Sequence, residues 1–378
     1  MNEIKTKNEI INTNSFIDLK KSEEFKKSEN FKLFPNSINI YKIIIIFLII
    51  LLLILLSLIF LIIKIKKKEI SQLIYKYESD FLLNYSKSNS SSIKNIYLNY
   101  EFHNFERDKI TKKMKKYSKW ELIKNEPYFI NGIIRKFKPK KCLEIGVASG
   151  GSAVLILNAL KDINDSFLVS LDLNNNLYYN KNKKTGYVVE EYFKELVSDN
   201  KWHLFTGEQP HKFLEKLNLK YDFLFLDTAH LAPGELINII EVLPFLEENA
   251  IIVMHDIMYH LPSNKYYRPK EIKFHPIQIY LMTALSGNKV FIKDEEKGVE
   301  NIGAIFLNSN QKDYYLNYFL LLLSPWEYLP TDNQIEELRI FIKKYYEKDI
   351  YLNIFNRAIE ENKIYISKFK TLYNNLFS

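Results

Sequence analysis

Cysteine is almost absent from this chain of 378 residues, which contains one, Cys142. A single cysteine cannot form an internal disulfide, so the fold is stabilised without a disulfide framework, and this favours a reducing compartment such as the cytosol. The apolar share of 47% is large enough for an ordinary hydrophobic core. The sequence therefore predicts a folded protein with at least one globular domain.

A clustered basic region is also missing. The formal net charge is +8 and the pI is near 9.0, but the lysines are spread along the chain together with many Asn, Ile and Tyr residues. This spread indicates a general compositional bias, and no signature of a DNA- or RNA-binding module is present. We therefore expect no nucleic-acid partner.

Charge is absent from one long run, residues 43–63, whose sequence is IIIIFLIILLLILLSLIFLII. A helix of this length reaches about 30 Å at ~1.5 Å per residue, which matches the hydrocarbon core of a bilayer. The run predicts a single transmembrane helix. The polar residues 1–40 before it are expected to be a disordered tail, and residues 64–117 after it a juxtamembrane helix and linker.

Beyond the linker, short apolar runs alternate with helical patterns, which predicts a parallel sheet covered by helices. The predicted strands are 142–145, 167–171, 202–205, 223–226 and 250–254. The predicted helices between them are 152–161, 187–198, 209–217 and 234–246. A helix at 276–286 and strands at 290–292 and 302–307 would complete a Rossmann-like, doubly wound, mostly parallel seven-stranded α/β domain over residues 118–310. Residues 311–378 are expected to form a helical C-terminal extension.

Glycine is scarce, with 10 in the chain, yet Gly146, Gly150 and Gly151 fall within six residues directly after the first predicted strand. A glycine-rich turn from a strand into a helix lets the backbone approach a ligand, and the helix N-terminus offers N–H groups to a carboxylate or phosphate. Glu144, at the end of that strand, could meet an ammonium group directly or through water. The alternative is an ordinary tight turn.

Asp172 ends the second predicted strand, where an acidic side chain can accept hydrogen bonds from ribose hydroxyls. The same position suits a dinucleotide, but Ala148 replaces the third-position glycine of a GxGxxG turn, which makes NAD the weaker candidate. A helix-capping role explains Asp172 equally well. Glu208, after the third strand, is placed to line an adenine pocket, although loop polarity explains it equally well.

Four further groups follow the fourth and fifth predicted strands: Asp227, His230, His255 and Asp256. The carboxyl ends of parallel strands share one edge of a sheet, so these side chains should converge over the ligand crevice. Two carboxylates and two imidazoles there could bind a divalent cation or remove a proton from a substrate hydroxyl. Helix capping and packing are the alternatives.

The segments LEIGVASGGSAVLILNAL, SLDL, FLFLDTAH and IIVMHD together resemble the class I S-adenosylmethionine-dependent methyltransferases. The resemblance is to the small-molecule and sugar O-methyltransferase branch, which has relatives called cephalosporin hydroxylase-like, and it covers about residues 118–310. It implies that Glu144, Gly146 and Gly150 surround the methionine part of the cosubstrate, next to Gly151. It also implies that Asp172 holds the ribose.

The resemblance further implies metal ligands, because Asp227 and Asp256 match positions where relatives place metal-binding carboxylates. His255 precedes Asp256 as in relatives with an HD pair. Metal-dependent members usually supply a third carboxylate, where this chain has a histidine, so Mg²⁺ is a second cofactor that the resemblance suggests without establishing. The implied reaction is the attack of a substrate hydroxyl on the sulfonium methyl group, with His230 or His255 taking the proton.

Lysines flank residues 43–63 on both sides, with a slight excess after the run, which favours a cytoplasmic catalytic domain. A cytosolic cosubstrate favours the same orientation. The anchor and the sugar-methylating relatives suggest a small-molecule or glycan acceptor in the cell envelope. The alternatives are an inactive membrane-bound scaffold, an NAD-dependent oxidoreductase, and an assembly factor that acts through its C-terminal helices.

Overall fold

The structure is a computed structural model, and it describes residues 48–63 and 65, most of 110–117, residue 122, residues 125–257 except 198–199 and 229, and residues 281–377 except 283 and 295–297. The chain divides into two units, Met1–Lys64 and Ile65–Ser378. The predicted tail over 1–40 lies outside the described residues, as does most of the predicted linker over 64–117.

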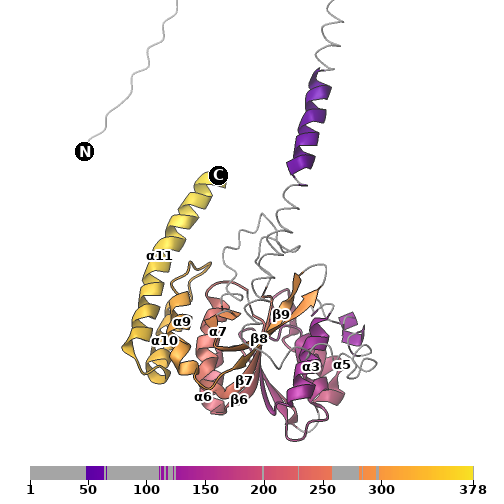
Figure 1. Cartoon of the computed structure of the whole chain (residues 1–378), viewed down its shortest axis with the longest axis vertical. Helices are drawn as coiled ribbons and strands as arrows, with labels where there is room; N and C mark the ends of the chain where they lie inside the picture. Colours follow the sequence, from indigo (N-terminus) through magenta and orange to yellow (C-terminus); the bar gives the residue numbers. More distant parts are fainter. Residues whose placement is uncertain are drawn as a thin grey trace, which may run out of the picture. The chain divides into compact units, whose positions relative to one another are not determined.

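In the first unit, residues 48–63 form one helix, drawn in indigo in Figure 1. Its side chains are exposed throughout, from Leu48 at 55% to Ile63 at 59%. Residues 43–47 of the expected transmembrane run lie outside the described part of the chain. Among the residues that the structure describes, no helix is long and apolar enough to cross a membrane.

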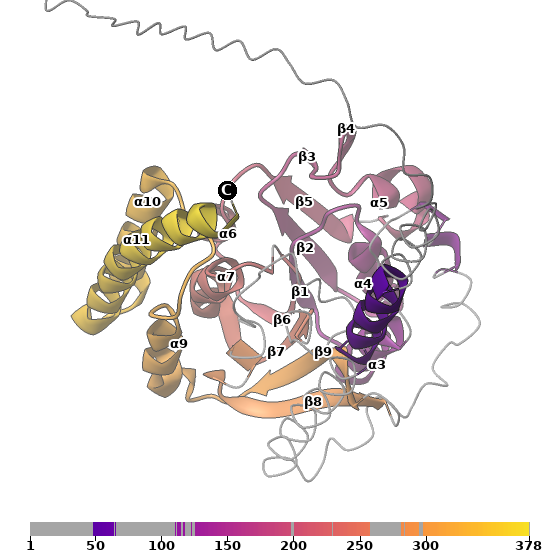
Figure 2. The ribbon, with the colours of Figure 1, turned by 90° about the horizontal axis from the view of Figure 1, so that it is seen from above.

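The second unit is built on a seven-stranded sheet in the order β5-β2-β1-β6-β7-β9-β8 (Figure 2). Its strands are β1 (Lys141–Ile145), β2 (Phe167–Asp172), β5 (Trp202–Thr206), β6 (Tyr221–Leu226), β7 (Leu246–His255), β8 (Gly287–Asp294) and β9 (Gly298–Leu307). Only β9 runs against the others, because it pairs antiparallel with both β7 and β8. The predicted seven-stranded, mostly parallel sheet is confirmed.

Helices cover both faces of the sheet (Figure 2). One face carries α3 (Glu126–Phe137), α4 (Gly151–Leu160) and α5 (Tyr187–Tyr192). The other carries α6 (Pro210–Leu217), α7 (Gly234–Val242), α9 (Tyr315–Leu321), α10 (Asp332–Tyr345) and α11 (Asp349–Phe377). Successive side chains of a strand point to opposite faces and join two hydrophobic clusters. Leu143 and Ile145 of β1 pack with α7 and the C-terminal helices, whereas Cys142 packs with α3 and α4.

Local features also differ from the sequence prediction. Apolar residues at helical spacing predict a helix between 118 and 137, and α3 begins at Glu126, because Pro127 lacks an N–H group and fits the first turn of a helix; most of residues 118–124 lie outside the described part of the chain. A small hairpin of β3 (Asn176–Leu177) and β4 (Asn180–Lys184) follows β2, where its polar sequence gave no alternating strand pattern. The helix expected over 276–286 is described only in part: residues 281, 282 and 284 are helical, 285 and 286 are not, and 276–280 lie outside the described residues.

The C-terminal extension is helical, as predicted, with an aromatic break over residues 324–330. Helix α10 begins after a capping box, in which the Thr331 side chain accepts a hydrogen bond from the backbone of Gln334. Phe341 of α10 and Phe355 of α11 belong to the same hydrophobic cluster as Leu143 of β1. The extension therefore shares its core with the sheet.

Glu144 is a fully buried carboxyl group in the central strand β1. Ser152 of α4 and Ser170 of β2 donate hydrogen bonds to its two oxygens, at 2.6 and 2.5 Å. Trp202 of β5 donates in turn to the Ser170 hydroxyl, at 2.9 Å. Burial is the main cause that raises the pKa of Glu144 from 4.5 to about 7. The side chain therefore links a helix to two strands.

We predict that Glu144 makes the unfolding free energy pH-dependent. Its pKa is higher in the folded state than in the unfolded state, so its contribution is greatest below pH 4.5 and falls as the pH rises to about 7. The fall should be about 3 kcal/mol at ~1.4 kcal/mol per pKa unit. Denaturant unfolding of the wild type and Glu144→Gln at about pH 5 and pH 8 measures it. Glu336→Gln, an exposed control, should follow the wild type; parallel pH profiles for Glu144→Gln and wild type would contradict the prediction.

Candidate active site

The glycine turn between β1 and α4 lies at the centre of the sheet, where the neighbours of β1 are β2 on one side and β6 on the other. From β1 the chain adds β2 and β5 on one side of the sheet and then β6 and β7 on the other, so a crevice forms outside the carboxyl ends of the strands where the order reverses. A Cβ atom on Gly146, whose φ is +90°, would lie 1.7 Å from the backbone oxygen of Asp227. The turn therefore packs backbone to backbone against the end of β6.

Gly150 and Gly151 complete this turn. Gly150, with φ +97°, is the N-cap of α4, and Gly151 is the first residue of the helix. The turn is braced by the segment before α5, because the N–H of Gly186 donates to the oxygen of Ala148 at 2.8 Å. The N-terminus of α4 thus lies at the turn, and the N-terminus of a helix is where backbone N–H groups can bind an anion.

Asp172 lies beside the turn, at the carboxyl end of β2. One of its carboxylate oxygens accepts hydrogen bonds from the N–H groups of Val147 and Ala148, at 2.9 and 3.0 Å, and the other accepts from Asn174 at 2.8 Å. The carboxylate therefore holds the glycine turn against β2. Leu173, the next residue, is 54% exposed, so an apolar surface lies next to the position predicted for the ribose.

Two predicted cosubstrate residues have other described partners. The carboxylate of Glu144 is enclosed between α4 and β2 and contacts Ser152 and Ser170. Glu208 is partly exposed in the loop after β5 and pairs with Lys212 of α6 at 2.9 Å. Lys212 pairs also with Glu337 of α10 at 2.8 Å, so Glu208 belongs to a surface ion-pair group.

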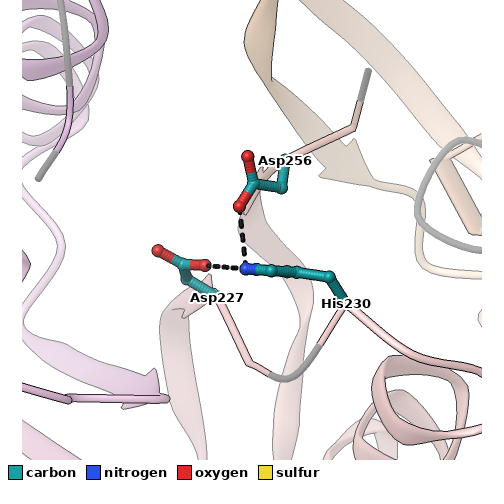
Figure 3. A group of neighbouring side chains, drawn as sticks. All are labelled: Asp227, His230 and Asp256. Carbon is teal, nitrogen blue, oxygen red and sulfur yellow. Dashed lines mark ion pairs between the residues drawn. The ribbon is translucent and has the colours of Figure 1, made fainter. Parts of the chain in front are cut away.

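The structure brings together Asp227, His230 and Asp256 at the carboxyl ends of β6 and β7 (Figure 3). Nε2 of His230 lies 2.8 Å from a carboxylate oxygen of Asp256 and 3.5 Å from one of Asp227. His230 has a φ of +54° and Asp256 a φ of +55°, in the left-handed region that few side chains adopt. The convergence of these strand-end residues is the arrangement that the sequence predicts.

His255 joins the same group from β7. Its Nδ1 lies 3.2 Å from Asp227 and 3.4 Å from Asp256, and its Nε2 lies 3.3 Å from Glu126 of α3. The side chain of His255 is 12% exposed, compared with 22% for His230. His255 is therefore enclosed by carboxylates from three elements, whereas His230 is more open to the crevice.

Sequence reasoning missed three residues that contact this group. Glu126 lies 129 positions from His255, Asn301 of β9 donates to Asp256, and the Glu235 carboxylate accepts the backbone N–H of His230. Glu126 and Asn301 are far from the strand ends in sequence. No sequence signal could have found Glu126 or Asn301. Their contacts depend on where α3 begins and on the pairing of β9 with β7, which are set by the tertiary fold.

Opposite charges set the protonation of this group. Burial alone would lower the pKa of both imidazoles, but Asp256 and the other carboxylates outweigh it and raise the pKa of His230 and of His255 well above 6.5. Burial would raise the pKa of Asp256, and the two imidazoles instead hold it well below its usual value. The structure therefore favours ion pairs between imidazolium and carboxylate groups.

The group also has the composition of a metal site. Ligand atoms of Asp227, His230 and Asp256 lie within 4.8 Å of one another. Two carboxylates and one imidazole suit a divalent transition-metal ion such as Mn²⁺ or Zn²⁺, whereas Mg²⁺ prefers oxygen ligands alone. The donor set thus fits a divalent cation and discriminates against the Mg²⁺ that the resemblance suggests.

The residues that build this site also match a known protein family. Residues 143–257, which hold the glycine turn and the acid–imidazole group, match the family model of a methyltransferase domain. No curated protein shows significant similarity to the chain.

Solved structures with a similar fold include three methyltransferases. A putative O-methyltransferase from Klebsiella pneumoniae is 18% identical over 53% of this chain and 89% of its own, with a TM-score of 0.41. The O-methyltransferase TomG from Streptomyces achromogenes, in complex with SAM, is 14% identical over 54% and 90%, with a TM-score of 0.40. The SAH-bound methyltransferase PaMTH1 from Podospora anserina is 17% identical over 62% and 96%, with a TM-score of 0.37.

The family match covers the strands and turns that build the crevice, and the sheet has the mostly parallel, seven-stranded form expected of this group. On this evidence the chain contains a methyltransferase domain over residues 143–257.

Proposed function

We propose that the enzyme transfers the methyl group of S-adenosylmethionine to a hydroxyl group of a small-molecule or saccharide acceptor. The observation that carries this proposal is the contact between Gly146 and the backbone of Asp227. It joins the turn that would hold the cosubstrate to the acid–imidazole group that would act on a hydroxyl. A methyl donor and an acceptor bound on the two sides of this contact would lie next to each other, as an in-line displacement requires.

The cosubstrate would bind along the turn and the end of β2. Backbone N–H groups at the start of α4 suit its carboxylate, and the Asp172 carboxylate suits the ribose hydroxyls. The exposed Leu173 side chain would pack against the adenine ring. Glu144 would act on this site through Ser152 and Ser170, because it is enclosed between them.

The reaction forms one bond and breaks another. The acceptor oxygen attacks the methyl carbon, the carbon–sulfur bond breaks, and the sulfonium becomes the neutral sulfide of S-adenosylhomocysteine. The hydroxyl proton goes to a base, for which His230 is better placed than His255 because its side chain is more exposed. His255, between Glu126 and the two aspartates, would hold the two aspartates in position.

The first test is cosubstrate binding. We expect calorimetric titration of S-adenosylhomocysteine into the full chain to give binding that Asp172→Ala weakens by about tenfold or more, since the carboxylate also holds the turn. Asp222→Ala is a matched control, because Asp222 accepts two backbone N–H groups at 2.9 Å, from Lys140 and from Lys141 at the start of β1. Binding of NAD in place of S-adenosylhomocysteine would support the oxidoreductase alternative, and no binding of either would support the scaffold alternative.

The protonation of the base should determine how the methyl-transfer rate depends on pH. A base acts in its neutral form, so the raised pKa of His230 predicts a transfer rate that rises with pH well beyond 6.5. His230→Gln should lower the rate by about 100-fold or more and remove this rise. The measurement is transfer of a labelled methyl group to acceptors found by screening glycans and simple alcohols. A rise that persists in His230→Gln and disappears in His255→Gln would assign the base to His255 instead.

The proposal includes a divalent cation held by Asp227, His230 and Asp256. When bound, the cation would hold the acceptor oxygen and lower the pKa of its hydroxyl group. In that case His230 would be a ligand and the base would lie elsewhere. The same methyl-transfer assay after chelation, with Mg²⁺ or Mn²⁺ returned, separates the two roles of His230: restoration by Mn²⁺ supports the ligand role, and full activity after chelation supports the base role.

We further propose that residues 43–63 anchor the enzyme in a membrane, with the catalytic domain on the cytoplasmic side. The support is the uncharged sequence together with the helix over 48–63, whose side chains are all exposed. We expect the full chain to float with lipid vesicles and Leu51→Arg/Leu55→Arg to be released, since each charge costs about 3 kcal/mol at the centre of a span. Ile350→Arg on α11 is the control, and equal flotation of all three proteins would contradict the proposal.

A further inference from the structure

The segment between α9 and α10 contacts the loop that carries His230. The backbone N–H of Glu327 donates to the oxygen of Ala232 at 2.9 Å. The Glu327 side chain completes the pair, because its Oε2 accepts the N–H of Ala232 at 3.1 Å. One residue of the C-terminal extension thus satisfies both backbone groups of a fully buried residue two positions after His230.

This segment is itself fixed to α11. The N–H of Trp326 donates to the Asn362 side chain at 2.6 Å, and the Asn362 amide donates to the oxygens of Ser324 and Ala358 at 3.2 and 2.9 Å. Trp326 and Asn362 are 1% and 2% exposed. Glu327 therefore follows a residue that is hydrogen-bonded to α11, so the segment is tied to this helix as well as to the His230 loop.

The loop is short and closely bonded on the other side of Ala232. The N–H of Gly234 donates to Leu231 at 2.7 Å, and the Glu235 carboxylate accepts the N–H of His230. His230 has a φ of +54°. A left-handed conformation of a residue other than glycine costs about 1 kcal/mol or more, and it persists where surrounding contacts hold it. A shift of Ala232 would therefore change the direction of the imidazole.

We infer that Glu327 is a positioning residue that directs His230 toward Asp227 and Asp256. The C-terminal extension is then part of the active site, although it lies outside residues 143–257 that match the methyltransferase domain. Glu327 acts through the backbone of Ala232 and touches none of the reacting atoms. The inference goes beyond the proposed function, because it concerns the orientation of His230 whether this side chain is a base or a metal ligand.

The test observes His230 directly and needs no acceptor. The full chain contains seven histidines, so ring-labelled histidine gives few signals, and His230→Gln identifies the signal of His230. In Glu327→Ala we expect this signal to move or broaden and the Ala232 amide to exchange about tenfold faster. Glu327→Gln keeps an oxygen that accepts the Ala232 N–H, so it should restore both readouts. S-adenosylhomocysteine affinity should stay within about twofold, because the sites are separate.

The matched control is Glu336→Ala. Glu336 lies on α10 of the same extension and pairs with Arg339 at 3.1 Å, so its loss should leave the His230 signal unchanged. If Glu327→Ala does not fold, Glu327→Asp provides the comparison, because it keeps the charge and draws the carboxylate back by one methylene group. It should move the His230 signal in the same direction.

Two results would overturn the inference. One is a His230 signal that stays in place in the folded alanine or aspartate variant, which would make the contact local packing alone. The other is a glutamine variant that behaves like the alanine variant, which would show that the hydrogen bond to Ala232 is not the cause. Failure of the wild type to bind S-adenosylhomocysteine would instead contradict the proposed function and leave the comparison of His230 signals intact.

Discussion

The contact between Gly146 and the backbone of Asp227 is the constraint on which the site depends. A Cβ at this position would lie 1.7 Å from a carbonyl oxygen, far below the van der Waals contact distance, and neither strand end can retreat because both lie in the interior of the sheet. The absence of one side chain lets the turn after β1 and the loop after β6 meet. Every later feature of the crevice is placed relative to this meeting point.

The second constraint is electrostatic. Asp227 and Asp256 would repel each other in a half-buried site, yet two imidazoles lie between and beside them, and Glu126 balances the far side of His255. Each charge is compensated by a neighbour from a different element, so the cluster links β6, β7 and α3. Removal of one partner would leave a buried charge unpaired, which is more costly than the pair is stabilising.

The sequence predicts the sheet well because its strands are short apolar runs separated by helical patterns, and each run pairs within one domain. The convergence of Asp227, His230, His255 and Asp256 was predictable for the same reason, since the ends of parallel strands meet at one edge. The surroundings of Glu144 were not predictable. A strand-end acid can face a ligand or the core, and the choice depends on Ser152 and Ser170, which come from two other elements.

The residues that contact the acid–imidazole group show more clearly what cannot be predicted from the sequence. No spacing in the sequence relates Glu126 to His255 or Glu327 to Ala232, because these contacts join segments 129 and 95 residues apart. They follow from the way α3 and the C-terminal helices pack on the sheet. The reactive residues at the strand ends can be predicted from the local sequence, whereas the residues that hold them in place depend on packing between distant segments.

The bond between Trp326 and Asn362 has a consequence for how the coding sequence can be shortened. Asn362 lies near the middle of α11, and it fixes the segment that reaches the His230 loop. A chain that ends between residues 257 and 362 would therefore keep the whole matched methyltransferase region and still lose a support of the His230 loop. The contacts that support this loop thus extend well beyond the matched region.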